Sequence, residues 1–519
     1  MKRIFCLLMV LCMTLCCLSA LAETYPEEQV SYKVYIRLRS TNGDPDTMQL
    51  FQEMEEVTNV HMDFVKVPEA EWSEKISLLL GAGVDLPDAL YSAYAMTGEE
   101  MVNYGSQGIL IALNDYIDQY MPNLTKVLTE HPDIRASITA PDGNIYGLPY
   151  VVEDGITGQI PSNMFINKTW LDKLGLEIPT TIDELEAALI AFKEQDPNGN
   201  GQADEIPMTF QFLSSQRDLG GLFGMFGYAD RIYAGQHHFV VDDGKVIFVP
   251  ATEGYKEGCA YLYEHFFSKG LIDIEGFTMD KATYKAQNQN DDANIGVFFG
   301  WNIYDLGTKH VDEYVPFAPV LGPNGTTSWG QVAASGMEPK GLVVTNACKD
   351  PKYLLMWADL LYDEYYAMQM SYGPIGVNLI DNGDGTYDYA ETPEGQTYDE
   401  FKFGNTFPDS CLALFRDFYD RMLPLPENSV AKDQVNTELY LPVATSVYYP
   451  KLLFAEEDND QIALIGNDII AYAEEMRAKW LAHGGVEDEW DAYIQRLNTM
   501  GLEEYTEIYQ RTYDNAYVE

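Results

Sequence analysis

Basic side chains are scarce in this chain. Its 519 residues contain 32 Lys and Arg against 81 Asp and Glu, which gives a formal net charge of −49. So negative a surface repels nucleic acids and anionic lipid, and it disfavours a polyanionic ligand unless a local basic pocket exists. Arg217, Lys309 and Lys340 are candidates for such a pocket, although nothing in the sequence shows that they converge. We expect no nucleic-acid partner.

Histidine and cysteine are also few. None of the seven histidines is spaced as a metal ligand, and four of the seven cysteines lie within the first 17 residues. The remaining three, Cys259, Cys348 and Cys411, form no disulfide framework or zinc pattern. No G-x-S-x-G elbow, P-loop or dinucleotide fingerprint occurs where a strand-to-helix turn would require it.

Long apolar runs are limited to the N-terminus. Lys2 and Arg3 precede an apolar stretch over residues 4–18, and Ala20-Leu21-Ala22 follows it. This pattern indicates a secretory signal peptide over residues 1–22. We therefore expect a secreted protein on the extracellular or periplasmic side of the cell envelope. The remaining chain is too long for one core, so at least two lobes are expected.

Lipid attachment would require a small residue directly before a cysteine in this leader. Cys12 and Cys16 follow leucine, and Cys17 follows Cys16. We expect release rather than lipid anchoring.

Strand and helix patterns alternate at the start of the mature chain. Strands are predicted over residues 30–40, 60–67 and 87–91, with helices over 46–57 and 71–81 between them. Such spacing predicts right-handed crossovers and a mostly parallel sheet. Because ligands bind beyond the carboxyl ends of strands in open α/β sheets, this prediction brings a small set of residues to a cleft: Ser40, Thr41, Tyr91 and Tyr94.

An oxygen-rich loop lies between Asp196 and Pro207. Asp196, Asn198 and Asn200 alternate before Gly201, and then come the backbone carbonyl of Gln202 and the side chains of Asp204 and Glu205. Ca²⁺ takes six to eight oxygen ligands, and alternating Asx residues around a glycine turn supply them. The twelfth position of a strict EF-hand is Glu, whereas here it is Pro207. We predict a structural calcium site; the alternative is an ordinary turn that binds nothing.

The surroundings of this loop resemble a known family. The motifs appear in order as residues 143–150 (GNIYGLPY), 164–168 (MFINK), 171–176 (LDKLGL) and 179–185 (PTTIDEL). This order is similar to the family 1 extracellular solute-binding proteins that serve carbohydrate ABC importers. The resemblance extends over nearly all of the mature chain, and the calcium-type loop resembles that of larger oligosaccharide-binding members.

The resemblance implies a two-lobe α/β fold of the type II periplasmic-binding-protein-like class. Each lobe would be a mixed sheet flanked by helices, with hinge crossings and a helical C-terminus. We predict that residues 23–150 and 316–372 form the first lobe, and that 151–315 and 373–519 form the second. The crossings would lie near 150–153, 314–316 and 372–376.

The resemblance also implies ligand contacts. Trp301, which follows a buried strand and Gly300, would stack on a sugar face; its alternative is a packed core position. Glu153 would accept hydrogen bonds from hydroxyl groups, or else be a solvated loop acid. The remaining candidates are Gln216 and Arg217 after a second strand, Trp329 as a stacking platform or a loop anchor, and Tyr372 at the third crossing.

These expectations favour a secreted, monomeric binding protein over an enzyme. It would capture a carbohydrate, most simply an oligosaccharide, by hinge closure and deliver it to an ABC importer permease. The competing hypothesis is a secreted glycan-cleaving enzyme that uses two cleft carboxylates, which the 81 acids leave open.

Overall fold

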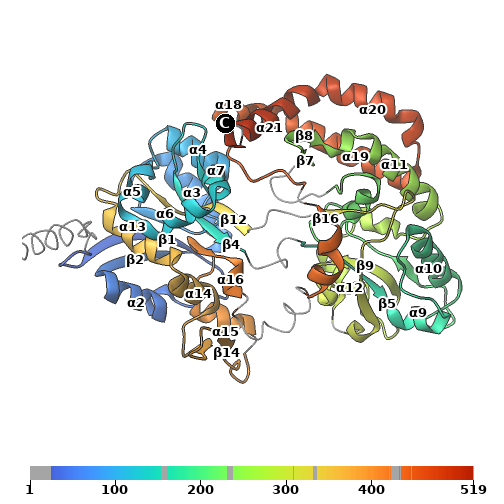
Figure 1. Ribbon diagram of the computed structural model, residues 1–519, viewed down its shortest axis with the longest axis horizontal. Helices are drawn as coiled ribbons and strands as arrows, with labels where there is room; N and C mark the ends of the chain where they lie inside the picture. Colours follow the sequence, from blue (N-terminus) through green and yellow to red (C-terminus); the bar gives the residue numbers. More distant parts are fainter. Residues whose placement is uncertain are drawn as a thin grey trace, which may run out of the picture.

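The protein has two lobes side by side, with the C-terminal helices across one end (Figure 1). The computed structural model describes residues 25–153, 160–230, 238–307, 309–330, 336–396, 398–419, 434–445 and 447–517, together with positions 421 and 432. The predicted signal peptide and residue 154 lie outside these ranges. Among the described helices, none combines the length and apolar character needed to cross a bilayer.

The first lobe is built on a six-stranded sheet. The strand order is β15-β4-β12-β3-β1-β2, and every strand runs parallel to the others except β12. The strands are β1 (Val30–Leu38), β2 (Val60–Pro68), β3 (Ala89–Tyr91), β4 (Gly147–Val152), β12 (Gly336–Val344) and β15 (Leu412–Leu414).

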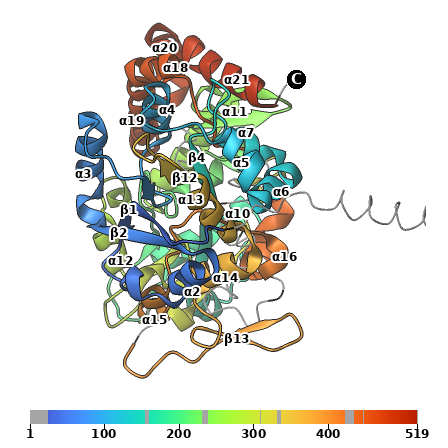
Figure 2. The same ribbon diagram turned by 90° about the vertical axis from the view of Figure 1, so that its left-hand side faces the viewer.

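Helices cover both faces of this sheet. Leu50, Phe51 and Met54 of α2 pack into one core, whereas Trp72 and Ile76 of α3 pack into another. Figure 2 shows β1 and β2 from the first-lobe side, with the C-terminal helices above them. The helices of this lobe are α2 (Gln49–Thr58), α3 (Glu69–Ala82), α4 (Gly98–Ser106), α5 (Asn114–Tyr120), α6 (Pro122–Glu130), α7 (Pro132–Ile138), α13 (Lys352–Asp359), α14 (Glu364–Tyr372), α15 (Tyr398–Asn405) and α16 (Arg416–Tyr419).

The second lobe is built on a four-stranded sheet. Its order is β10-β5-β9-β6, in which β5 runs against the other three strands. The strands are β5 (Asn163–Asn167), β6 (Ile206–Met208), β9 (Ile295–Gly300) and β10 (Tyr314–Phe317). Two small two-stranded sheets accompany it, β7 (Phe239–Asp242) with β8 (Lys245–Phe248) and β11 (Trp329–Gly330) with β16 (Ala444–Thr445).

Local sequence signals explain the helix starts of this lobe. Thr181 and Glu184 form a reciprocal capping box at the start of α10, which satisfies two otherwise unpaired backbone donors. The helices are α9 (Lys168–Leu174), α10 (Ile182–Glu194), α11 (Glu253–Leu262), α12 (Lys281–Ala286), α18 (Glu456–Gln461), α19 (Asn467–His483), α20 (Val486–Met500) and α21 (Leu502–Tyr517). The predicted helical C-terminus is confirmed.

A buried charge network fastens α19 to the body of the second lobe. Arg477, which has no exposed surface, pairs with Asp218 at 2.8 Å and with Asp230 at 3.4 Å. Asp230 also lies 2.6 Å from His238 Nδ1, and Glu474 lies 3.6 Å from the other ring nitrogen. Fully buried charges persist only when paired, so this network fixes the position of the helix.

The chain crosses between the lobes three times. It leaves the first lobe after β4, returns between β11 and β12, and crosses again between α16 and Asn436. Two predicted crossings are corrected. Tyr314–Phe317 is a strand of the second sheet, and residues after Tyr372 as far as Phe418 pack into the core of the first lobe. The predicted boundaries at 316 and 373 therefore come too early.

The predicted elements agree with the structure wherever the periodicity is clear. The predicted strands that begin at 30, 60 and 87 are confirmed. Residues 114–130 form two helices rather than one, because Pro122 lacks the donor that would continue α5 and instead starts α6.

Candidate functional site

The carboxyl ends of five parallel strands lie at one edge of the first sheet. Ser40 and Thr41 follow β1 in an exposed turn at this edge. The guanidinium groups of Arg37 and Arg39 lie 3.4 Å and 2.5 Å from the carboxylate of Asp409. Burial raises the pKa of Asp409, and both arginines oppose that rise. The edge thus combines exposed hydroxyls with cations that are already paired.

Glu153 lies at the same edge, directly after β4. Its backbone N–H donates to the carbonyl of Leu414, and its carboxylate Oε2 accepts from the backbone N–H of Arg416 at 3.2 Å. Its side chain is half-buried. These bonds hold the acid beside the first crossing, where the sequence placed it. The adjacent Asp154 lies outside the described residues.

The two predicted tyrosines at and after the end of β3 differ in exposure. Tyr94 is 47% exposed, and the Arg37 guanidinium lies over its ring at 5.4 Å. Tyr91 has no exposed surface; its hydroxyl bonds Ser410 and its ring meets Trp357 edge-on. The prediction of a ligand contact at Tyr91 is corrected, because alternate residues of a strand point to opposite faces and Tyr91 points into the core.

A matching edge exists on the second lobe. β5 runs against β9, so its first residue, Asn163, lies opposite Gly300 at the end of β9. Trp301 follows immediately and is half-buried. Its backbone N–H donates to Asp305 at 2.5 Å, and the same carboxylate pairs with Arg217 at 2.9 Å. The structure therefore brings Trp301 and Arg217 together through one shared acid.

Arg217 is only 5% exposed and lies 5.8 Å from the ring of Tyr284. Gln216 beside it is half-buried, and its backbone N–H donates to the hydroxyl of Ser214 at 3.4 Å. Arg217 is thus a paired, buried cation that supports the loop of Trp301. Gln216 is the more accessible neighbour.

Sequence reasoning missed Lys432. Its side chain is 3% exposed, and its ammonium donates to the Trp301 carbonyl at 2.7 Å, to Asn163 Oδ1 at 2.8 Å and to the Ile160 carbonyl at 3.0 Å. The same nitrogen lies 4.3 Å from the centre of the Trp301 ring. No sequence motif marks this lysine, because its partners come from distant parts of the chain.

Two other predicted contacts lie elsewhere. Trp329 is 1% exposed, donates to the carbonyl of Ser162 at 3.1 Å and meets the ring of Tyr440 edge-on. This finding corrects the stacking prediction and supports the anchor alternative. Tyr372 is half-buried in the first lobe, with the Lys402 ammonium 4.4 Å above its ring. It is therefore not at a crossing.

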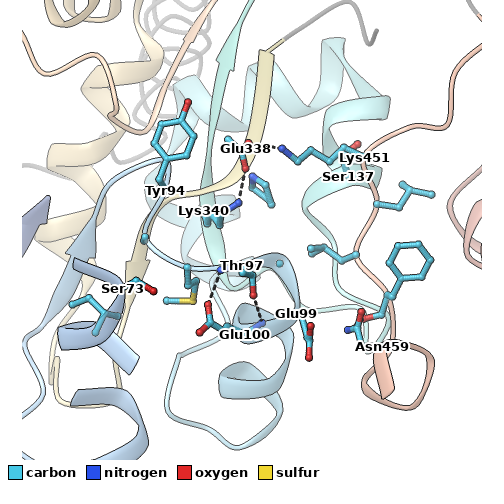
Figure 3. A pocket seen from close by; sticks show the side chains of 18 of the residues that line it. Ser73, Tyr94, Thr97, Glu99, Glu100, Ser137, Glu338, Lys340, Lys451 and Asn459 are labelled. Carbon is cyan, nitrogen blue, oxygen red and sulfur yellow. Dashed lines mark hydrogen bonds and ion pairs between the residues drawn. The ribbon is translucent and has the colours of Figure 1, made fainter. Parts of the chain in front are cut away.

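A cavity of about 610 Å³ lies between the first lobe and the C-terminal segment 449–462. Figure 3 shows Glu338 between Lys340 and Lys451, with Thr97 and Glu100 of the α4 cap nearby. Burial lowers the pKa of Lys340, and Glu338 opposes that change. Of the predicted ligand contacts, only Tyr94 lines this cavity.

The Asx loop is held together by its own hydrogen bonds. Asp196 accepts from the N–H groups of Gly199 and Gly201, and Asn198 and Asn200 each accept from the N–H two residues on. The side-chain nitrogens of both asparagines donate to Asp204, 3.1 Å away. The loop thus gathers these four side chains, with the asparagine nitrogens turned toward Asp204.

Glu205 adds a second observation at this loop. Its Oε1 is buried without a hydrogen-bond partner in the structure. Burial raises the pKa of its carboxyl group, and the nearby charges of Asp196 and Asp204 raise it further. Within the described residues, no three His, Cys, Asp or Glu side chains are arranged to hold a metal. Any ion here would therefore depend on the amide oxygens and the Gln202 carbonyl as well.

Comparison with known proteins decides the family. The model of the bacterial extracellular solute-binding proteins matches residues 40–364, more than half of the chain. This chain belongs to that family. Its sheets, crossings and C-terminal helices are those of a periplasmic-binding-protein-like solute-binding protein, so the fold predicted from the sequence is confirmed.

Two relatives whose names state a ligand match most of the length of this solute-binding protein. The fructooligosaccharide ABC transporter substrate-binding protein FusA of Streptococcus pneumoniae is 33% identical over 480 residues, or 91% of this chain and 87% of FusA. The polygalacturonan/rhamnogalacturonan-binding protein YtcQ of Bacillus subtilis is 28% identical, and the match covers 67% of each chain.

Solved structures superpose over nearly the whole chain. FusA in complex with kestose has a TM-score of 0.76 at 31% identity, covering 94% of this chain and 99% of FusA. A second FusA structure, with fructo-nystose, is described as an EF-hand mutant. An HMO-binding solute-binding protein of Bifidobacterium longum infantis has a TM-score of 0.76 at 27% identity, covering 95% and 100% of the two chains.

Proposed function

We propose that this protein is the secreted binding component of a carbohydrate ABC importer, and that it captures an oligosaccharide between its lobes. The observation that carries the proposal is the 33% identity with FusA across 91% of the chain. The geometry agrees, because β4 ends at the edge of one sheet and the next strand, β5, begins at the edge of the other. A ligand between these edges would touch both lobes, and hinge closure would enclose it.

The ligand is a neutral oligosaccharide. Cations near both edges are already engaged: Arg39 with Asp409, Arg217 with Asp305, and Lys432 with three oxygens. They are not arranged to receive a chain of carboxylates such as a galacturonan. Together with the formal charge of −49, this favours ligands of the kind that FusA binds over those of YtcQ.

Each proposed contact has a distinct part in binding. Trp301 offers an aromatic face against which the apolar C–H face of a sugar ring can pack. Ser40, Thr41, Tyr94, Glu153 and Gln216 offer hydroxyl, carboxylate and amide groups that select hydroxyl patterns. Affinity would come mainly from the ring contact, and specificity from the polar groups.

The described residues at the first-lobe edge offer the enzyme alternative no suitable acid. A glycosidase needs a carboxyl group with a raised pKa facing its substrate, together with a second carboxylate. At the first-lobe edge, the acid whose pKa burial raises is Asp409, and it is held by two arginines. We therefore propose binding without turnover.

A panel of oligosaccharides tests the proposal. The mature protein is titrated calorimetrically with kestose, nystose, neutral milk oligosaccharides and an oligogalacturonate, and the mixtures are then chromatographed for products. We expect saturable binding of a neutral oligosaccharide and recovery of the intact sugar. Binding of the oligogalacturonate alone would refute the neutral ligand class. Cleavage that Glu153→Gln abolishes would establish the enzyme instead.

We also propose that the Asx loop holds a structural Ca²⁺. Asp196, Asn198, Asn200, the Gln202 carbonyl, Asp204 and Glu205 would be the ligands. The buried Glu205 oxygen without a partner fits a cation, because a buried polar atom requires a compensating contact. When bound, the ion would supply charge compensation and rigidity, and it would take no part in contact with the sugar.

The proposed location and partners follow from the same family. The protein would be a monomer released outside the cytoplasmic membrane, and the sugar-bound closed form would dock on a membrane permease. Detection of the protein in the culture medium or periplasm, with no lipid on its N-terminal residue, would test the predicted release.

A further inference from the structure

Lys432 lies where the crossings enter the second lobe. Its three donors are directed to Ile160 and Asn163, which follow the first crossing, and to Trp301, which follows β9. A lysine ammonium has three donors and no acceptor, so each of these three oxygens can receive one of its protons. The lysine itself belongs to the third crossing, and it is 3% exposed.

Neighbouring bonds extend this junction. Asn163 donates to Asn436 Oδ1 at 2.7 Å, and Asn436 donates to the Ile160 carbonyl at 3.3 Å. Because Lys432 can only donate, the oxygen of Asn163 must face it, which fixes the amide orientation of both asparagines. The first and third crossings are therefore joined by a continuous chain of buried hydrogen bonds.

The second crossing reaches the same place. Trp329, at its start, donates to the carbonyl of Ser162, between Ile160 and Asn163, and packs edge-on against Tyr440. Described residues beside all three crossings are thus in contact with one another. Of these contacts, Lys432 is the one that also touches the Trp301 backbone and ring.

We propose that Lys432 is a positioning residue that couples the Trp301 platform to the lobe crossings. The inference rests on the proposed function, in which Trp301 contacts the sugar. A shift of the 300–302 loop on sugar binding cannot be absorbed locally. It would break the hydrogen bond from the buried Lys432 ammonium to the Trp301 carbonyl and leave that carbonyl without this donor. The shift is instead passed to Ile160 and to the third crossing, where it biases the lobes toward closure.

A ligand-free experiment tests the physical connection. In Lys432→Met the apolar stem is kept, but Asn163 Oδ1 and the Trp301 carbonyl lose this donor, and the Ile160 carbonyl keeps only Asn436. We expect amide hydrogen exchange to rise together in the peptides around 160–166 and 301–307. Lys432→Gln keeps an amide donor, and it should produce a smaller rise in the same two peptides. A rise confined to one of the two peptides would overturn the coupling.

A double-mutant cycle tests the role in binding, with nystose as the probe. Lys432→Met should weaken binding about tenfold in the wild-type background and less than about twofold in Trp301→Ala, since contacting residues that act together are not additive. Lys193→Met is the matched control, because Lys193 donates to the Lys269 carbonyl elsewhere in the second lobe. It should leave the nystose affinity unchanged in both backgrounds.

The outcomes separate the two proposals. Suppose that Trp301→Ala weakens nystose binding. The inference about Lys432 is then wrong if Lys432→Met lowers the affinity equally in the wild-type and Trp301→Ala backgrounds, or lowers it in neither; the proposed function stands in both cases. If wild-type protein binds none of the neutral oligosaccharides of the panel, the proposed function and the coupling that depends on it both fail. If Trp301→Ala binds nystose as wild type does, Trp301 is not in the site and the coupling alone fails. Lys432→Gln serves in the cycle if Lys432→Met does not fold.

Discussion

The stability of the second lobe should depend on the charge of His238. Burial alone would lower the pKa of this imidazole, but the Asp230 carboxylate at 2.6 Å and Glu474 at 3.6 Å raise it to about 9 from 6.5, against the opposing charge of Arg477. Among the described residues, Phe248 packs edge-on against the ring and Tyr255 bonds to Asp230, and both are uncharged at neutral pH.

The sign and size of the effect follow from linkage. A group whose pKa is higher in the folded state stabilises that state below its unfolded pKa, and the contribution is lost as the pH rises through the folded pKa. A difference of about 2.5 pKa units corresponds to about 3 kcal/mol. The contribution of His238 should therefore be complete near pH 6 and absent above about pH 9.5.

The comparison variant is His238→Asn. The backbone of His238 is left-handed, with φ of 67°, and asparagine tolerates that conformation while removing the titrating group. Urea unfolding is followed by tryptophan fluorescence, because five of the seven tryptophans belong to the second lobe. We expect the wild-type advantage in unfolding free energy to shrink by about 3 kcal/mol between pH 6 and pH 9.5. Parallel pH profiles for the two proteins would refute the assignment of a charged His238.

Three further predictions concern the sugar site and the loop. Trp301→Ala should weaken oligosaccharide binding by about 2 kcal/mol, roughly thirtyfold in Kd by calorimetry, with unchanged circular dichroism, whereas an unaltered Kd would remove Trp301 from the site. EDTA should lower the Tm of the wild-type protein, and Asp196→Ala should abolish that sensitivity. Asp384→Ala should not abolish it, since Asp384 lies in a separate exposed turn where it accepts from the N–H of Thr386; a melt insensitive to EDTA would favour a plain turn. Tyr91→Phe should cost about 1 kcal/mol of stability by losing its bond to Ser410 and leave Kd unchanged, and a loss of affinity without loss of stability would return Tyr91 to the site.

Local patterns predicted the fold well. The alternation in residues 30–38 and 60–68 is strong because one side of each strand is buried more deeply than the other. The lobe boundaries were predicted poorly. A strand such as Tyr314–Phe317 has the same local pattern in either lobe, and only its pairing with β5 shows which sheet it joins. Such pairing between distant segments leaves no periodic trace in the sequence.

The site was predictable only where a strand end or loop pattern marks it. Trp301 and Glu153 stay predictions, and the structure places each directly after a strand. Tyr91 and Trp329 were assigned to the ligand because an aromatic residue near a strand end looks the same whether it faces the core or the cleft. Lys432 could not be found, since its partners Ile160 and Trp301 are more than 100 residues away in the chain.

The core of the second lobe has a consequence for export. It joins residues near 160 to Tyr505 and Tyr509 of the last helix, and Arg477 meets Asp218 within it. A chain that emerges N-terminus first cannot complete this core until its final helix has been delivered. Several hundred residues must therefore stay incompletely folded outside the membrane, with apolar surface exposed to solvent. Such a state is prone to aggregation. Deleting the last helix should leave a secreted chain that proteases remove, even though every proposed sugar contact would still be encoded.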